Sequence, residues 1–241
     1  MLREGGGGPD ARYFHISAVL FQLEYKTISM KKNLVIVLVL SLAVLGARAQ
    51  AKARVGLCLG LNESSYKESF QSNEFTSDWK TGLHAGVFGE LPLSGRFGLE
   101  ADLLYSQKGG VDPGDTSMPK ISIRLNYLTL PVLLNFYITP KLAVQAGPEI
   151  GLLLVARAHS GDYTATVHDV YRSFETGVAG GIFYQLPRGL SVGVRYIQGF
   201  KPITKPLQFT NSLGGQVGVV SIGNNRTAQL TVHYVLWQKK G

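Results

Sequence analysis

Acids, histidines and serines are the side chains through which this sequence could carry out chemistry. Glu100 and Asp102 stand two residues apart in the stretch "GLEADLLYSQKGG" at 98–110, where they alternate with apolar residues. Two carboxylates on one face of a strand can act as an acid and a base, or they can be fixed charges in an ion-pair network. The choice depends on what that face of the strand meets.

The histidines form no recognisable metal-binding or catalytic pattern. His159 and His168 share a polar segment with Asp162 and Asp169, but their spacing matches no zinc-ligand pattern, so we interpret this segment as a solvated loop. The sequence also lacks the G-x-x-x-x-G-K pattern of a phosphate-binding loop. We therefore expect no catalytic residues, no metal, no cofactor and no enzyme activity.

Residues 30–49 have the pattern of a secretory signal peptide. Two lysines precede an apolar core at 34–45, which ends before a small-residue cleavage site at 47–49. This core is too short for a membrane-spanning helix, which needs about 20 apolar residues. We expect the mature chain to begin near Gln50, and we interpret residues 1–29 as a non-native upstream extension.

Charge and cysteine content narrow the function classes. The whole chain has a formal net charge of +8 at pH 7, and the charged residues are spread along it rather than clustered. Nucleic-acid binding usually needs a clustered basic face, so we expect no nucleic-acid partner. Cys58 is the only cysteine, so an exported chain can form no internal disulfide and must be held by hydrogen bonds and packing.

Apolar and polar side chains alternate with a period of two through most of the mature chain, which predicts strands. We place eight strands at 53–62, 81–92, 97–108, 121–138, 142–158, 173–186, 190–199 and 226–237. The connections are alternately long and short; the long ones are 63–80, 109–120, 159–172 and 200–225, and Gly95, Pro140, Pro187 and Gly189 mark the short ones. Short turns at one end and long loops at the other are typical of outer-membrane β-barrels.

The polar faces of these strands repeatedly carry glycine, as at Gly60 and Gly193. A water-facing sheet surface avoids glycine, which weakens a strand and packs nothing. Glycine is useful where side chains converge, and an eight-stranded barrel is only wide enough for side chains to fill it. We therefore place the polar faces inside a barrel, with Glu100 and Asp102 pointing inward and Leu103 facing lipid.

The predicted interior contains charges that must be paired, because a buried charge without a partner is costly. The expected structural network consists of Arg54, Glu90, Glu100, Asp102, Glu149, Glu175 and Arg195. We expect the two arginines to neutralise the carboxylates, with His84 and His233 available beside them. This assigns the acids a structural role rather than a catalytic one.

Several stretches resemble the PorT-like outer-membrane β-barrel family of Bacteroidota. They are "GLEADLLYSQKGG", "LNYLTLPVLLNFYI", "LAVQAGPEIGLLL", "FETGVAGGIFYQL" and "AQLTVHYVLW", and together they extend over nearly all of the mature chain. The resemblance implies an eight-stranded barrel that the barrel-assembly machinery inserts into the outer membrane. It implies no single activity, although the family has a member associated with type IX secretion. The chain departs from the usual aromatic ending of such barrels, because four further residues follow Trp237.

Together these observations predict an all-β fold, with an eight-stranded antiparallel up-and-down transmembrane β-barrel at 50–241. We expect an outer-membrane protein that has a structural or interaction role through long extracellular loops and is not a general porin. The expected partners are outer-membrane lipid and lipopolysaccharide, the barrel-assembly machinery and secretion-complex proteins. Two alternatives for function are an accessory component of type IX secretion and a secreted small-ligand barrel whose apolar residues point inward. Ten strands would result if residues 214–223 added a hairpin.

Overall fold

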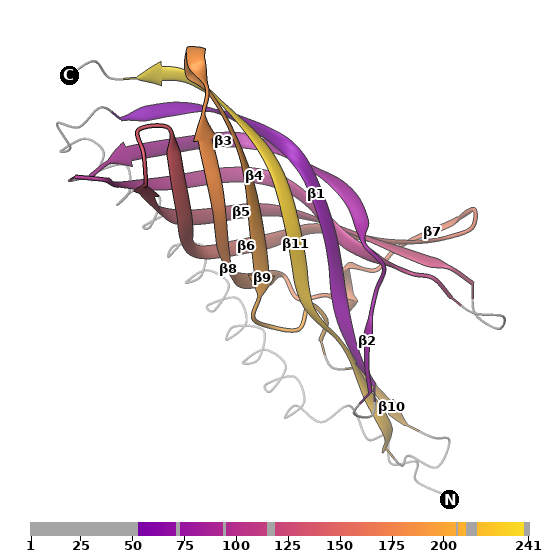
Figure 1. Cartoon of the computed structure of the whole chain (residues 1–241). Coiled ribbons are helices and arrows are strands. Elements are labelled where there is room, and N and C mark those ends of the chain that lie inside the picture. Colours follow the sequence, from indigo (N-terminus) through magenta and orange to yellow (C-terminus); the bar gives the residue numbers. More distant parts are fainter. Residues whose placement is uncertain are drawn as a thin grey trace, which may run out of the picture. The chain divides into compact units, whose positions relative to one another are not determined.

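The described part of the chain is an antiparallel β-sheet that closes on itself (Figure 1). The computed structural model describes residues 53–70, 73–93, 95–114, 119–205, 207–210 and 216–238. The expected signal peptide at 30–49 and the expected extension at 1–29 lie outside the described residues. Among the described residues, no helix is long and apolar enough to cross a membrane, a finding that concerns helices alone.

The described chain contains strands and two short 3-10 helices. In chain order they are β1 (Arg54–Phe70), β2 (Asn73–Thr76), β3 (Lys80–Pro92), β4 (Phe97–Asp112), β5 (Ile121–Tyr137), β6 (Leu142–Ser160), β7 (Tyr163–Thr166), η1 (His168–Val170), β8 (Phe174–Gln185), η2 (Pro187–Gly189), β9 (Leu190–Gly199), β10 (Leu207–Thr210) and β11 (Gln216–Gln238). Neighbouring strands in the ring are antiparallel throughout.

Eight of these strands form the ring. Their order is β1, β3, β4, β5, β6, β8, β9 and β11, and β11 pairs with β1 to close it. The short strands β2, β7 and β10 pair with β1, β6 and β11 outside the ring path. The prediction of an eight-stranded up-and-down barrel is therefore confirmed.

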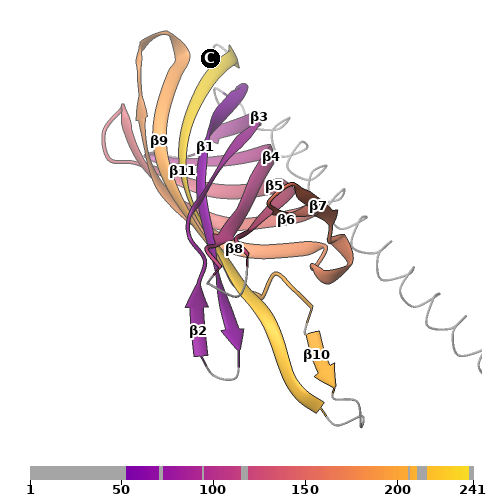
Figure 2. The same cartoon turned by 90° about the vertical axis from the view of Figure 1, so that its right-hand side faces the viewer.

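Several strands continue further towards the loop end than the sequence pattern predicted. β1 runs to Phe70 and β4 runs to Asp112, so the predicted loops at 63–80 and 109–120 begin with strand. The β1 extension is mostly polar and the β4 extension begins with two glycines, so the apolar alternation stops before the hydrogen bonding does. From Gln216 the segment expected to add a hairpin belongs to β11 and pairs with β10, and Figure 2 shows these ribbons projecting beyond the ring.

The short turns have the predicted chemistry. Gly95 and Gly189 have φ angles of +65° and +77°, in the left-handed region that glycine enters without strain. Thr139 Oγ1 accepts hydrogen bonds from the backbone N–H groups of Lys141 and Leu142, at 3.2 and 3.0 Å. Local bonding of this kind reverses the chain within a few residues and places both neighbouring strands side by side in the ring.

The two faces of the wall have opposite polarity. Within β4, Asp102 is 1% exposed and points into the ring, whereas the next residue, Leu103, is 45% exposed on the outer face. The exposed apolar residues of the outer face include Leu57, Leu59, Leu61, Leu83, Val87, Leu134, Ile182, Val194, Leu230 and Val232. An apolar exterior is the arrangement of a barrel in lipid, and it is the reverse of what the secreted small-ligand alternative requires.

The loop end of the interior is filled by apolar side chains. The segment that follows β6 and the segment that follows β9 meet there: the backbone N–H of Arg172 donates to Ile203 O at 2.8 Å, and Tyr171 pairs with Thr204 in a β-bridge. Tyr171 and Ile203 are each 3% exposed. They pack in one cluster with Tyr66, Ile123, Leu125, Tyr127, Leu153 and Ala156. We call this cluster the apolar plug.

Candidate functional site

The structure places all seven residues of the predicted network inside the barrel. Glu90, Glu100, Asp102, Glu149, Glu175 and Arg195 are buried, and Arg54 is partly buried near the turn end. They come from six strands, and each lies at a position whose neighbours in sequence face outward. The alternation that defines a strand is therefore what brings these charges into one interior, where they separate into three groups.

The first group is centred on Arg195 of β9. Its Nη1 atom lies 2.9 Å from Asp102 Oδ2, and its Nη2 atom lies 3.3 Å from Glu100 Oε1. The amides of Gln145 and Asn135 donate to the two oxygens of Glu100 at 3.1 and 3.2 Å. One guanidinium therefore holds both carboxylates of the "GLEADLLYSQKGG" stretch, and neutral amides complete the coordination of Glu100.

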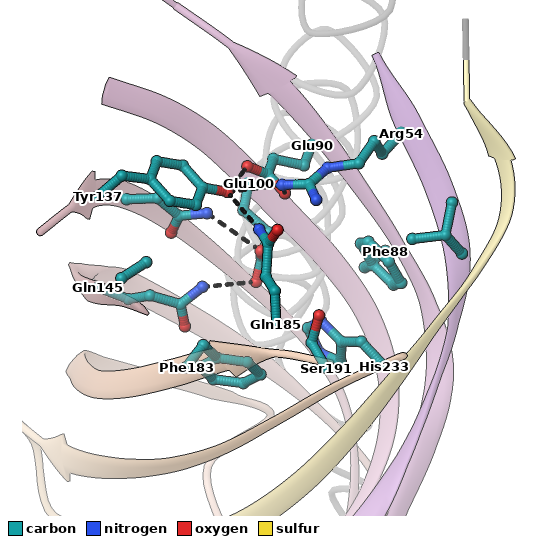
Figure 3. Close-up of a pocket in the computed structure, with 13 residues that line it drawn as sticks. Arg54, Phe88, Glu90, Glu100, Tyr137, Gln145, Phe183, Gln185, Ser191 and His233 are labelled. Carbon is teal, nitrogen blue, oxygen red and sulfur yellow. Dashed lines mark hydrogen bonds and ion pairs between the residues drawn. The ribbon is translucent and has the colours of Figure 1, made fainter. Parts of the chain in front are cut away.

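The second group lies at the turn end (Figure 3). Arg54 Nη2 lies 2.6 Å from Glu90 Oε2 and donates to the Tyr137 hydroxyl at 2.6 Å, while that hydroxyl donates to the other oxygen of Glu90. When the Gln185 amide is oriented with its oxygen towards Arg54, it accepts from both terminal nitrogens at 3.0 Å. These residues join β1, β3, β5 and β8 across the mouth of the barrel.

The third group was not predicted, and it corrects the expected pairing. Glu149 and Glu175 contact Lys108 rather than an arginine: Lys108 Nζ lies 2.8 Å from Glu149 Oε1 and 3.5 Å from Glu175 Oε2. Asn225 donates to Glu175 at 3.1 Å. Lys108 stands in the same quoted stretch as Asp102, six residues further on, so the alternation already indicated that it faces inward.

The two expected histidines do not pair with the carboxylates. His84 uses Nδ1 towards Asn62 Oδ1 at 2.8 Å and Nε2 towards Thr231 Oγ1 at 3.0 Å. His233 stacks on Phe88 with ring centroids 4.4 Å apart, and its Nε2 atom has no hydrogen-bond partner among the described residues. The histidines therefore contribute to polar and aromatic packing of the interior.

Glycine on the inner face makes room for these rings, as the sequence analysis inferred. A Cβ atom at Gly60 would collide with the ring of His84, and one at Gly193 would collide with the ring of Phe183. Both glycines lie directly opposite the ring they accommodate in the strand register. The narrow interior is thus filled by large side chains from some strands fitting against glycine on others.

Glu100, Asp102 and His233 are a group that could be considered for a metal ion, because one ligand atom of each lies within 4.8 Å of the others. Both carboxylates, however, are bound to the guanidinium of Arg195. A permanent positive charge at that distance repels a cation, so the residues present do not fit a metal site.

The cavity between the first and second groups is small. Figure 3 shows this cavity, lined by Arg54, Glu90, Glu100 and His233 among others. Its volume is about 20 Å³, which is room for about one water molecule. A wider vestibule opens beyond Arg54 at the turn end, bordered by Pro92, Gly95 and Pro140 among others. The vestibule therefore leads to side chains and not to a channel.

These features define an integral β-barrel of the outer membrane. The family of outer membrane protein beta-barrel domains matches residues 48–205, and the chain belongs to this family. No curated protein matches the chain.

Solved structures of other barrels are similar to it. Neisserial surface protein A is 12% identical, with a TM-score of 0.48, over 76% of this chain and 97% of that one. Ail of Yersinia pestis is 13% identical, with a TM-score of 0.40, over 78% of this chain and 100% of that one. OprG of Pseudomonas aeruginosa is 11% identical, with a TM-score of 0.41, over 77% of this chain and 94% of that one.

Proposed function

We propose that this protein is a non-conducting outer-membrane barrel that acts through contacts made by its loops at the extracellular end. The observation that carries the proposal is the filled interior. Arg54 with Glu90, Arg195 with Asp102, and the group around Lys108 cross the lumen one after another. The apolar plug then closes the loop end. A barrel of eight strands with such contents leaves no continuous path for water.

Ionic current across planar lipid bilayers tests the proposal, with the mature chain refolded and inserted. We expect no stepwise current, while a general porin prepared in the same way gives large steps. A variant with Tyr171→Gly and Ile203→Gly opens only the apolar plug and is expected to stay silent, because the charged groups still fill the middle. Stepwise current from the unmodified chain would refute the proposal.

The proposal includes the absence of enzyme activity. A G-x-S-x-G string occurs at 189–193, but it begins in η2 and runs along β9, whereas a nucleophile elbow lies on a turn from strand to helix. Ser191 is the register partner of His233 on β11, yet His233 Nε2 makes no hydrogen bond to any described residue. The buried acids are also held by cations, which supports a structural role for them.

Membership of the PorT-like group, and with it a role in type IX secretion, is a second and narrower proposal. It is supported by the five stretches of sequence named above, which resemble that group. In it the barrel would contact secretion-complex proteins, and its insertion would depend on the barrel-assembly machinery. Deletion of the gene should then reduce secretion of cargo proteins that carry the carboxy-terminal secretion signal. Unchanged secretion would exclude this role and leave the non-conducting barrel unaffected.

A further inference from the structure

Towards the loop end, the outer faces of β5 and β6 change from apolar residues to arginine, and they do so at about the same level of the barrel. On β5 the outward residue Leu128 is 37% exposed, and the exposed outward residue four positions nearer the loop end is Arg124. On β6 Leu154 is 43% exposed, and the exposed residue Arg157 follows it towards the loop end. Both arginines therefore stand just beyond the apolar band, on the outside of the barrel.

These arginines are directly opposed in the sheet. Arg124 and Arg157 are register partners on antiparallel strands, so their Cβ atoms lie roughly 5 Å apart. We call Arg124 and Arg157 the basic patch.

The described residues supply no counter-charge to the basic patch. The ion pairs among them involve Arg54, Lys108 and Arg195, all inside the barrel. Like charges directly opposite each other in a sheet are destabilising. An anion that binds between the two guanidinium groups would remove this repulsion.

The position of the basic patch along the membrane normal indicates which anion could bind there. Four strand residues span about 13 Å, which a tilt of about 40° reduces to about 10 Å along the membrane normal. Arg124 therefore lies about 10 Å above Leu128, at the level of the headgroups rather than of the acyl chains. The corresponding outward residues Thr176 on β8 and Gln198 on β9 are uncharged, whereas β1 and β11 carry one charge of each sign, Glu63 and Arg226.

We propose that the basic patch binds phosphate groups of the phosphorylated glycolipid in the outer leaflet, as in lipopolysaccharide. This inference rests on the proposed function, because it requires the loop end to face the outer leaflet. A guanidinium presents paired N–H donors that fit two phosphate oxygens at once, and two adjacent guanidinium groups match the charge of one phosphate better than a single lysine does. The patch lies at one side of the ring, so it would fix a lipid on β5 and β6 and not around the whole barrel.

Binding of bisphosphorylated lipid A to the refolded mature chain in detergent, measured by native mass spectrometry, tests this inference. We expect the double variant Arg124→Gln/Arg157→Gln to bind at least roughly tenfold more weakly, since it loses the charge-assisted hydrogen bonds to the phosphate. The matched control is Arg96→Gln/Arg188→Gln, which removes two exposed arginines at the turn end and should leave binding unchanged.

Two further binding measurements distinguish a lipid phosphate from free inorganic phosphate. Lipid A without phosphates should bind the unmodified chain as weakly as bisphosphorylated lipid A binds the double variant. Inorganic phosphate at the same concentration should not compete, because it lacks the acyl chains that rest on Leu128 and Leu154. Competition by inorganic phosphate would mean that the patch is an anion site without lipid specificity and would overturn the inference.

Folding is followed separately so that the two proposals can fail independently. Folded barrels migrate differently in SDS gels before and after boiling, and both double variants should keep this shift. If Arg124→Gln/Arg157→Gln shows the shift and binds lipid A as tightly as the unmodified chain, the basic patch is refuted while the proposed function stays intact. Conduction by the unmodified chain would refute the proposed function whatever the lipid result.

Discussion

The side chains on the two faces of β4 are stabilised in different ways. Asp102 on the inner face depends on one partner, the guanidinium of Arg195 at 2.9 Å, whereas Leu103 on the outer face depends on no particular neighbour. Inside, stability comes from specific pairs in a space that cannot rearrange. Outside, any apolar environment of the right thickness is sufficient. The inner face should therefore be sensitive to the loss of a partner, and the outer face should be sensitive to the gain of a charge.

The largest effect is expected from Arg195→Ala. This change leaves Glu100 and Asp102 buried without a cation, and breaking a buried pair in this way costs about 3 to 5 kcal/mol. Urea unfolding of the barrel in detergent micelles, followed by tryptophan fluorescence, measures the loss. Arg188→Ala at the exposed η2 turn is the control and should change stability by less than about 0.5 kcal/mol. Equal stability of the two variants would show that Arg195 is not the required partner.

A somewhat smaller effect is expected from Leu103→Arg. An arginine in the middle of the lipid-facing band costs about 2 to 4 kcal/mol, so the variant should accumulate less in the outer membrane and show less of the heat-dependent gel shift. Leu103→Phe keeps the site apolar and should insert normally. Normal yield of Leu103→Arg would contradict the assignment of the outer face.

The smallest effect is the difference between one substitution, leucine to alanine, made on the inner face and made on the outer face. Leu104 is 1% exposed inside the barrel, so Leu104→Ala leaves a cavity and should cost about 2 to 5 kcal/mol. Leu103→Ala leaves no cavity, because lipid acyl chains close over the site, and should cost about 1 kcal/mol or less. Unfolding free energies of the two variants in the same vesicles should therefore differ by at least about 1 kcal/mol. Equal costs would mean that the interior is loosely packed at this level.

Sequence alone was sufficient for the eight strands of the ring and for the direction in which the side chains of their alternating segments point. The period of two places Glu100 and Lys108 inside and Leu103 outside, although the expected charge network did not include Lys108. The alternation fixes direction because successive Cβ atoms point to opposite sides of a strand. Glycine on the polar faces indicated which side is the interior, and in the structure two of these glycines lie opposite His84 and Phe183.

The sequence does not show at which level along the barrel axis the inward side chains of different strands meet. Strands in a barrel are tilted and staggered, so residues from different strands reach the same level only once the register is known. For this reason the pairing of Glu149 with Lys108, and not with Arg195, could not be read from the order of residues. The sequence pattern also did not predict the apolar plug, because Tyr171 and Ile203 come from predicted loops without any alternation.

The seam between β1 and β11 also constrains how the barrel comes into being. Its register joins Arg54 to Gln238, which are almost the two ends of the described chain. Pairing between such distant segments is slow, because the chain loses much of its freedom before the contacts form. Until β11 is in place, β1 has an unpaired edge that can join the strand of any neighbouring chain. Closure is therefore a late step, and the period before it is when this protein is most prone to aggregate.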